Sequence, residues 1–130
     1  MRKTLQNRKK CPTTNPMSCN IQAHVTVSNG CVLGDNVFIA PNSSLLNDKY
    51  PKSSLLTPPV VKDNVVIGGG VTVLPDVVLG ENSVIGGGSV VTANVPAGKV
   101  FMGVPAKEAM TKEEYVAKRE ALIKAKQDKR

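Results

Sequence analysis

Residues 61–96 read VKDNVV IGGGVT VLPDVV LGENSV IGGGSV VTANVP when they are written in blocks of six. Every block starts with Val, Ile or Leu, and its fifth residue is Val or Ser. The third and fourth positions are rich in Gly, Asn and Asp, which accept tight turns and left-handed backbone angles. A period of six excludes an amphipathic α-helix, which repeats about every 3.6 residues, and an alternating strand, which repeats about every 2. The pattern predicts short strands separated by corners.

The same register begins earlier, at residues 21–44, which read IQAHVT VSNGCV LGDNVF IAPNSS. The first positions of all ten full blocks are aliphatic: Ile21, Val27, Leu33, Ile39, Val61, Ile67, Val73, Leu79, Ile85 and Val91. If three blocks make one triangular coil, these side chains stack about 4.8 Å apart from coil to coil. We therefore predict an all-β fold, a parallel β-helix whose bore is filled by Val, Ile and Leu.

The repeat divides the chain into a basic N-terminal segment (1–20), a β-helix domain (21–105) and a C-terminal helix (106–130). Residues 45–60 form an excursion loop, because this stretch stands where a continuous repeat needs only a single block. Loops of this size on a rigid scaffold often carry function. The polar cluster Asn47, Asp48, Lys49 and Tyr50, where the chain leaves the prism, is thus a candidate site, although a tolerated insertion is the alternative.

The C-terminal segment changes pattern at Thr111, which forms a capping box with Glu114. Acidic residues in the first turn and lysines near the end support a helix from about Lys112 to Gln127. We expect this helix to pack on the open end of the prism or on a neighbouring subunit, because a solenoid must cover its last coil.

The formal charge of +7 lies in the two ends of the chain, since residues 1–10 carry +5 and residues 11–98 sum to −2. Basic tails without stacking aromatics are typical of solvated termini, so we expect no specific nucleic-acid binding. No apolar run reaches the length of a membrane span or a signal-peptide core, which predicts a cytoplasmic protein with no membrane partner. Three cysteines without C-x-x-C spacing favour reduced thiols over a disulfide framework or a metal site, and a Cys/His metal site with His24 is the alternative.

Three stretches resemble the hexapeptide-repeat acyltransferases: GDNVFIAPNSSLLNDKYPKS, IGGGVTVLPDVVLGENSVIGGGSVVTANVP and GVPAK. The resemblance covers about residues 21–107 and is nearest to the nucleotide-sugar N-acetyltransferases of bacterial surface-polysaccharide pathways. It implies a left-handed coil and a homotrimer. It also implies that acetyl-CoA, bound between adjacent prisms, donates its acetyl group to an amine on a UDP- or dTDP-linked sugar.

The resemblance also assigns roles within the excursion loop. Family members that acetylate hydroxyl groups use a His near the start of this loop as base, and Tyr50 stands at that position here. A sugar amine needs less help from a base, so orientation can suffice. Asn47 matches an Asn that contacts the acceptor in the amino-sugar subgroup; Asn47 and Asp48 are expected to hold the amine, beside Lys49 and Tyr50. His24, the only histidine, is a further candidate base across a subunit interface.

Coenzyme A is expected to lie against the small residues of successive corners, Gly69, Gly70, Gly87 and Gly88, although corner geometry alone also explains these glycines. Thr92, Lys99 and Lys107 are the expected phosphate and adenine neighbours. The chain departs from the family where V-T-K-D-V-P is replaced by Val91-Thr92-Ala93-Asn94-Val95-Pro96. The missing Lys removes one expected phosphate contact.

Three alternative functions belong to the same fold. A carbonic-anhydrase-like zinc site needs three His ligands, and the chain has one. A catalytically silent assembly or binding module is the second alternative. It is supported by residues 1–20, which contain no repeat where the similar enzymes usually have additional coils. An O-acetyltransferase is the third alternative.

Overall fold

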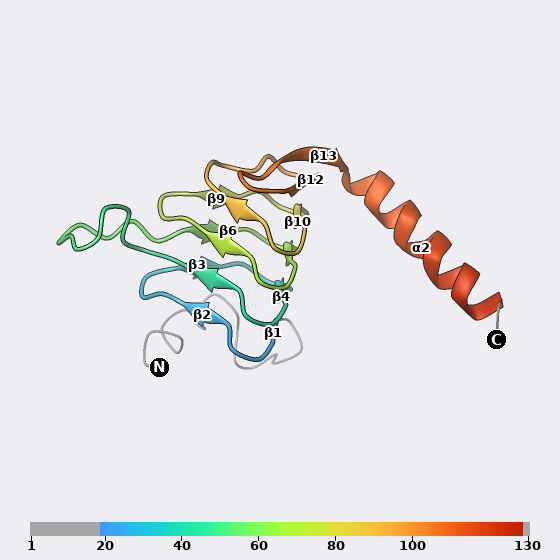
Figure 1. Cartoon of the computed structure of the whole chain (residues 1–130), viewed down its shortest axis with the longest axis horizontal. Coiled ribbons are helices and arrows are strands. Elements are labelled where there is room, and N and C mark those ends of the chain that lie inside the picture. The colour runs from blue at the N-terminus through green and yellow to red at the C-terminus, as the bar shows by residue number, and fades with distance from the viewer. Residues whose placement is uncertain (1–18, 129–130) are drawn as a thin grey trace.

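The computed structural model describes residues 19–128, which form a three-sided coil followed by one helix (Figure 1). Three sheets make the sides of the coil, and all their strand pairs are parallel except β12 with β13. Sheet 1 contains β1 (Asn20–Ile21), β4 (Phe38–Ile39), β7 (Val66–Ile67), β10 (Val84–Ile85), β12 (Lys99–Met102) and β13 (Lys107–Thr111). Sheet 2 contains β2 (Thr26–Val27), β5 (Ser44–Leu45), β8 (Thr72–Val73) and β11 (Val90–Val91). Sheet 3 contains β3 (Val32–Leu33), β6 (Val60–Val61) and β9 (Val78–Leu79).

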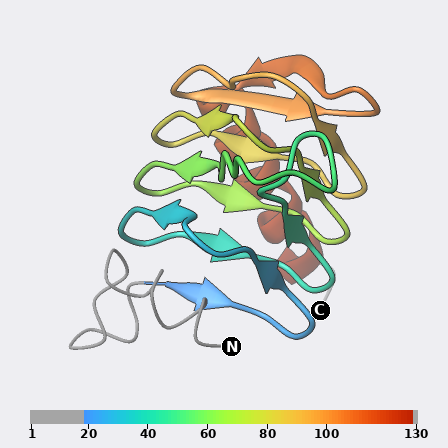
Figure 2. The same ribbon diagram turned by 90° about the vertical axis from the view of Figure 1, so that its left-hand side faces the viewer.

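Strand register confirms the period of the repeat. Val66 pairs with Val84, which lies three blocks, or one full coil, further along the chain. Phe38 pairs with Val66, and the chain between these two residues contains one full coil together with the excursion. The coils stack in line despite the excursion, as Figure 2 shows. The predicted β-helix and its single interruption are therefore confirmed.

The bore of the coil is filled mainly by aliphatic residues from the first and fifth positions of each block. Ile39, Ile67 and Ile85 form one column along sheet 1, in direct register, and each is at most 1% exposed. Cys31 occupies a fifth position, is free, and is buried, and burial raises the pKa of its thiol to about 12. Side chains alternate along a strand, so each two-residue strand can direct one side chain into the bore and the other outward.

We name the three edges of the prism by the corners that build them. The glycine edge follows sheet 1 and contains His24, Asn42, Gly70 and Gly88. The loop edge follows sheet 2 and contains residues 28–30, 46–59, 74–76 and 92–94. The asparagine edge follows sheet 3 and contains Asn36, Asn64 and Asn82. Most corners adopt φ near +60° to +70° at the fourth position of the block, for example Asn64 at 60° and Gly70 at 64°.

The C-terminal end of the bore is closed by β12, β13 and their connection. Phe101 and Ala106 pack against the core there, and Phe101 pairs with Ile85, so an aromatic ring ends the aliphatic column of sheet 1. Strand β13 runs antiparallel to β12, with Met102 opposite Lys107. Of the two places expected for the helix, the open end of the prism is wrong, because the hairpin supplies the cap, and a neighbouring subunit stays a prediction.

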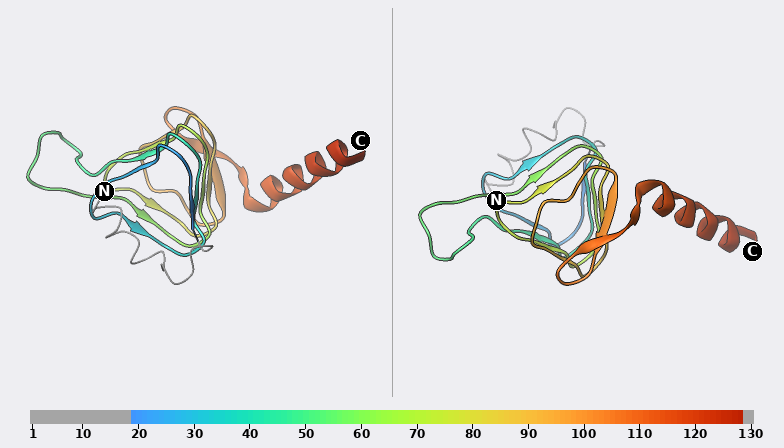
Figure 3. Two further views of the ribbon diagram at one scale, coloured as in Figure 1. Left: turned by 90° about the horizontal axis from the view of Figure 1, so that it is seen from below. Right: turned by 90° about the horizontal axis from the view of Figure 1, so that it is seen from above.

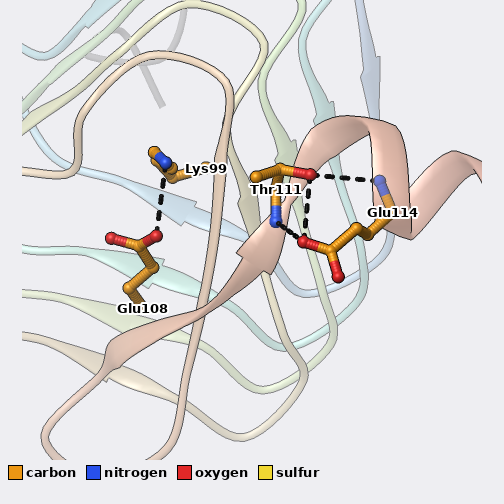
Figure 4. A network of polar contacts seen from close by, with 4 residues as sticks. All are labelled: Lys99, Glu108, Thr111 and Glu114. Atoms are coloured by element: carbon orange, nitrogen blue, oxygen red, sulfur yellow. Dashed lines mark hydrogen bonds and ion pairs between the residues drawn. The ribbon is translucent and has the colours of Figure 1, made fainter.

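Helix α2 (Lys112–Asp128) begins at the predicted capping box. The Thr111 backbone N–H donates to Glu114 Oε1 at 3.1 Å, and the Glu114 backbone N–H donates to Thr111 Oγ1 at 3.2 Å (Figure 4). The helix then projects away from the prism, and none of its residues is buried (Figure 3). Leu122 and Ile123 are 59% and 43% exposed. Within this chain the helix therefore covers no part of the core.

The N-terminal part of the chain departs from one expectation. Cys19 is disulfide-bonded, so the prediction of reduced thiols is wrong at that residue and holds for Cys31. The predicted basic segment, 1–20, lies almost entirely outside the described residues. No helix between residues 19 and 128 is both long and apolar enough to cross a membrane.

Candidate functional site

The excursion loop leaves the prism between β5 and β6, at the loop edge, and its neck is narrow (Figures 2 and 3). The Thr57 backbone N–H donates to the Asn47 carbonyl at 2.8 Å, which closes the loop on itself. The coil below holds the neck through Asn47 Nδ2, which donates to the Asn29 carbonyl at 3.0 Å. The coil above holds it through the Asp76 backbone N–H, which donates to the Thr57 carbonyl at 2.7 Å. The neck is thus tied to the coils on both sides of it.

Asp48 follows Asn47 and is half-buried. Its Oδ2 accepts a hydrogen bond from the Ser53 backbone N–H at 3.0 Å, whereas its Oδ1 is buried without a partner. One carboxylate oxygen therefore holds the loop in shape, and the other makes no hydrogen bond within the described residues.

Lys49 and Tyr50 are more exposed than Asn47 and Asp48. Lys49 Nζ lies 3.8 Å from Asp76 Oδ2, in an exposed ion pair of small energetic value. Tyr50 is 78% exposed, at the position where the O-acetylating relatives were expected to carry a His. The loop edge of this chain therefore presents no imidazole, because His24 lies on another edge.

Two polar residues at the neck were not predicted from the sequence. The side-chain oxygens of Asn29 and Thr57 are buried without partners, as is Asp48 Oδ1. Asn29 precedes Asn47 by one full coil, so the repeat period itself could have paired them. Thr57 is at the far end of the loop, and no periodic signal places it beside Asn47.

His24 and the predicted coenzyme A glycines share the glycine edge. The backbone of Asn42 donates to Ala23 at 3.1 Å, Gly70 to Pro41 at 3.0 Å, and Gly88 to Gly69 at 2.8 Å, so successive corners are linked. His24 is exposed and adopts φ 61°. Sheet 2 separates this edge from the loop edge, so one chain does not bring His24 or these glycines to Asn47.

The glycine triplets 68–70 and 86–88 contain two kinds of glycine. A Cβ on Gly68 would lie 2.7 Å from the Gly87 backbone nitrogen, and a Cβ on Gly86 would lie 2.8 Å from Met102 Cβ, so coil stacking demands both. A Cβ on Gly70 or Gly88 would meet nothing within 4 Å. Packing therefore explains only the first glycine of each triplet, and the others leave bare backbone along an exposed edge.

The remaining expected coenzyme A contacts are spread over the C-terminal coils. Thr92 is exposed on the loop edge. Lys107 pairs with Met102 at the glycine-edge end of β12, whereas Lys99 starts that strand at its other end. Lys99 Nζ lies 3.3 Å from Glu108 Oε2 (Figure 4). Only Lys107 is thus grouped with the glycines by the fold.

Within residues 19–128, no three His, Cys, Asp or Glu side chains lie close enough together to bind a metal ion. Bare backbone at Gly69, Gly70, Gly87 and Gly88 fits a long, flexible ligand such as the pantetheine arm of coenzyme A, because these residues add no side chain to the part of the edge beyond His24 and Asn42.

Comparisons with known proteins agree with this geometry. Residues 58–93 match the sequence model of the family described as bacterial transferase hexapeptide (six repeats). A Schizosaccharomyces pombe protein named as a candidate acetyltransferase is 42% identical over 87 residues, which cover 65% of this chain and 42% of that protein.

Solved structures of serine acetyltransferases share the fold. The enzyme from Brucella abortus in complex with coenzyme A has a TM-score of 0.61 and 28% identity, over 72% of this chain and 40% of its own. The enzyme from Neisseria gonorrhoeae has a TM-score of 0.55 and 27% identity, over 72% and 40%. This chain spans about two fifths of the length of these relatives. Over residues 58–93 the chain thus matches the hexapeptide-repeat transferase family, and its six-residue repeat and three-sided coil form a left-handed parallel β-helix.

Proposed function

We propose that this protein is an acetyl-CoA-dependent N-acetyltransferase that acts on an amino group of a nucleotide-linked sugar. The observation that carries the proposal is the loop neck, where Asn47 and Asp48 are held between neighbouring coils while Asp48 Oδ1 remains free for a ligand. The match of residues 58–93 to the transferase hexapeptide family supports acetyl transfer, and the coenzyme A bound to the Brucella abortus relative supports the donor.

Acetyl-CoA supplies a thioester carbonyl that an amine can attack. Asn47 and Asp48 orient the acceptor nitrogen, and proximity of this kind lowers the barrier without a strong base. The absence of His from the loop edge favours an amine over a hydroxyl group, because a hydroxyl acceptor needs a base to remove its proton. A backbone N–H group of a glycine corner is suited to stabilise the developing oxyanion, provided that it is not one of those that link successive corners, such as Gly70 and Gly88.

We also propose that the active form is a homotrimer in the cytoplasm. The loop edge and the glycine edge lie on opposite sides of sheet 2 in one chain. A site that uses both must form between copies, with the loop edge of one prism against the glycine edge of the next. His24 would then come from the neighbouring copy.

A free-thiol release assay with acetyl-CoA tests the proposal, using UDP- and dTDP-linked amino sugars as acceptors. We expect turnover with an amino sugar and a fall in kcat/KM of at least about tenfold in Asn47→Ala, which corresponds to about 1.4 kcal/mol. Asn64→Ala, on the asparagine edge, is the control. Unchanged turnover in Asn47→Ala would refute the assignment of Asn47.

O-acetyl transfer is the second candidate, because the similar solved structures are named serine acetyltransferases. Serine and the matching hydroxy sugars belong in the same assay, and turnover with these alone would favour it. A thermal-shift titration with acetyl-CoA tests the silent-module alternative. No stabilisation at millimolar acetyl-CoA would remove the enzyme proposal.

A further inference from the structure

Buried polar oxygens in folded proteins nearly always have hydrogen-bond partners, so those without one need an explanation. Within residues 19–128, four buried side-chain atoms lack a partner, namely Asn29 Oδ1, Asp48 Oδ1, Thr57 Oγ1 and Ser83 Oγ. Three of the four belong to the neck of the excursion loop. Ser83 is the exception, because it lies at a fifth position inside the bore and is fully buried.

The three neck residues are gathered around Asn47, although they come from separate parts of the chain. The Asn29 backbone carbonyl accepts from Asn47 Nδ2 at 3.0 Å, while its side-chain Oδ1 has no partner. Thr57 donates to Asn47 through its backbone at 2.8 Å, so its hydroxyl is likewise uncommitted. Asp48 is the next residue after Asn47. Hydrogen bonds to backbone groups thus hold this neck together, while one side-chain oxygen of each of the three residues makes no hydrogen bond.

Leaving these oxygens unpaired destabilises the folded chain, since a buried polar group without a partner loses its bonds to water. Apolar residues of similar shape would avoid that cost. Locally unfavourable arrangements of this kind are commonly found at active sites, where they contribute to ligand binding.

We propose that Asn29, Asp48 and Thr57 form an acceptor pocket that selects an amine over a hydroxyl group. This inference rests on the proposed function and adds two binding residues and the chemical class of the reacting group. A neutral amine offers two N–H donors and an ammonium offers three, whereas a hydroxyl group offers one. A pocket of several oxygen atoms is better matched to the nitrogen.

The pocket also contains a group that can accept the proton that the reaction releases. The acceptor nitrogen forms a bond to the acetyl carbon, and the bond from that carbon to sulfur breaks. The nitrogen loses one proton and the sulfur gains one, so coenzyme A leaves as a free thiol. Asp48 Oδ1, the only carboxylate oxygen among the three unpaired neck atoms, is the atom placed to carry that proton.

A metal cation is a poorer occupant of this pocket. Asp48 is the single carboxylate among the three residues, and no cluster of three ligating side chains occurs in residues 19–128. The single negative charge of Asp48 is matched to an amine, which carries either no charge or one positive charge.

Thr57→Val is the sharpest test, because it keeps the shape of the side chain and both backbone hydrogen bonds of Thr57. We expect the KM for the best amino-sugar acceptor to rise at least about fivefold, with the KM for acetyl-CoA unchanged and the melting temperature equal or higher. Asn29→Ala should raise the same KM, since the carbonyl that holds Asn47 is retained. Ser83→Ala is the matched control: it removes the fourth unpaired oxygen and should leave every kinetic constant unchanged.

Acceptors are supplied as UDP- and dTDP-linked sugars in pairs that differ only in an amine or a hydroxyl group. An unchanged acceptor KM in Thr57→Val, or an equal preference of the wild type for both members of a pair, would overturn the pocket. If the wild type transfers acetyl to no acceptor, the proposed function fails separately. Calorimetric titration with the same pairs then decides the pocket: amine-selective binding that Thr57→Val loses supports it, and equal or undetectable binding overturns it.

Discussion

The glycine edge and the asparagine edge have the same backbone but different side chains. Gly70 and Asn64 adopt φ 64° and 60°, and each donates its backbone N–H to the corner below, at 3.0 and 2.9 Å. On the asparagine edge the side chains bond to one another, with Asn36 Nδ2 donating to Asn64 Oδ1 at 3.0 Å. On the glycine edge the corresponding space is open.

This difference separates what the coil requires from what a ligand would require. Non-glycine residues adopt the left-handed conformation at six corners in residues 19–128: His24, Asn36, Asn42, Asn64, Asp76 and Asn82. A left-handed φ therefore does not by itself call for Gly70 or Gly88. The open edge leaves room for the approach of another molecule, and for this reason we propose that coenzyme A binds there.

The largest expected effect comes from the bore, which both edges share. Ile67→Ala removes a fully buried side chain from the column Ile39, Ile67, Ile85 and should lower the free energy of unfolding by about 2 to 5 kcal/mol. Urea denaturation measures it. Val66→Ala, one residue away on the outer surface, is the control and should cost less than half as much. Equal losses would show that the bore is not the main source of stability.

The next effect separates the two kinds of glycine on one edge. Gly68→Ala forces a Cβ to within 2.7 Å of a backbone nitrogen, and overpacking of this kind costs about 1 to 3 kcal/mol. The nearest atom to a Cβ on Gly87 is the Gly69 carbonyl oxygen at 3.4 Å, so Gly87→Ala should be markedly milder. Urea midpoints of the two variants give the comparison. A larger loss in Gly87→Ala would contradict the packing argument.

A reciprocal exchange tests the edges directly. Gly70→Asn places on the glycine edge the residue that already occupies the same conformation at Asn64, so stability should change by less than about 1 kcal/mol. Affinity for coenzyme A, measured by calorimetry, should fall at least about tenfold, because the side chain fills the open edge. Asn64→Gly should leave that affinity unchanged. Equal affinities in wild type and Gly70→Asn would remove coenzyme A from this edge.

The smallest effect lies outside both edges, at the helix cap. Hydrogen bonds from the Thr111 backbone and hydroxyl hold the pKa of Glu114 below its ordinary value of 4.5. A carboxylate with a lowered folded pKa stabilises the helix above pH 4.5, and this contribution is lost as pH falls through the folded value. Far-ultraviolet circular dichroism between about pH 7 and 3 should therefore show partial loss of helix, less marked in Glu114→Gln. Identical pH profiles would show that the cap carries no pH dependence.

Structural features that depend on the spacing of residues along the chain were predicted from the sequence, and features that depend on contacts between distant residues were not. The bore, the interruption of the repeat and the capping box were all predicted, because each depends on spacing along the chain. The closure of the bore by Phe101 and the projection of α2 were not, since they depend on how the last coil meets β13. Asn47 and Asp48 were named from their position at the start of the excursion loop, and their roles from a resemblance, while Asn29 and Thr57 became visible only in the structure.

The sequence by itself determined the coil, since a period of six with aliphatic first positions leaves the chain one way to bury them. Only the tertiary structure decided which corners share an edge and which glycines packing requires. It also showed which oxygens at the loop neck remain unpaired. These properties arise from contacts between residues on different coils or at opposite ends of a loop, and local sequence carries no direct record of such contacts.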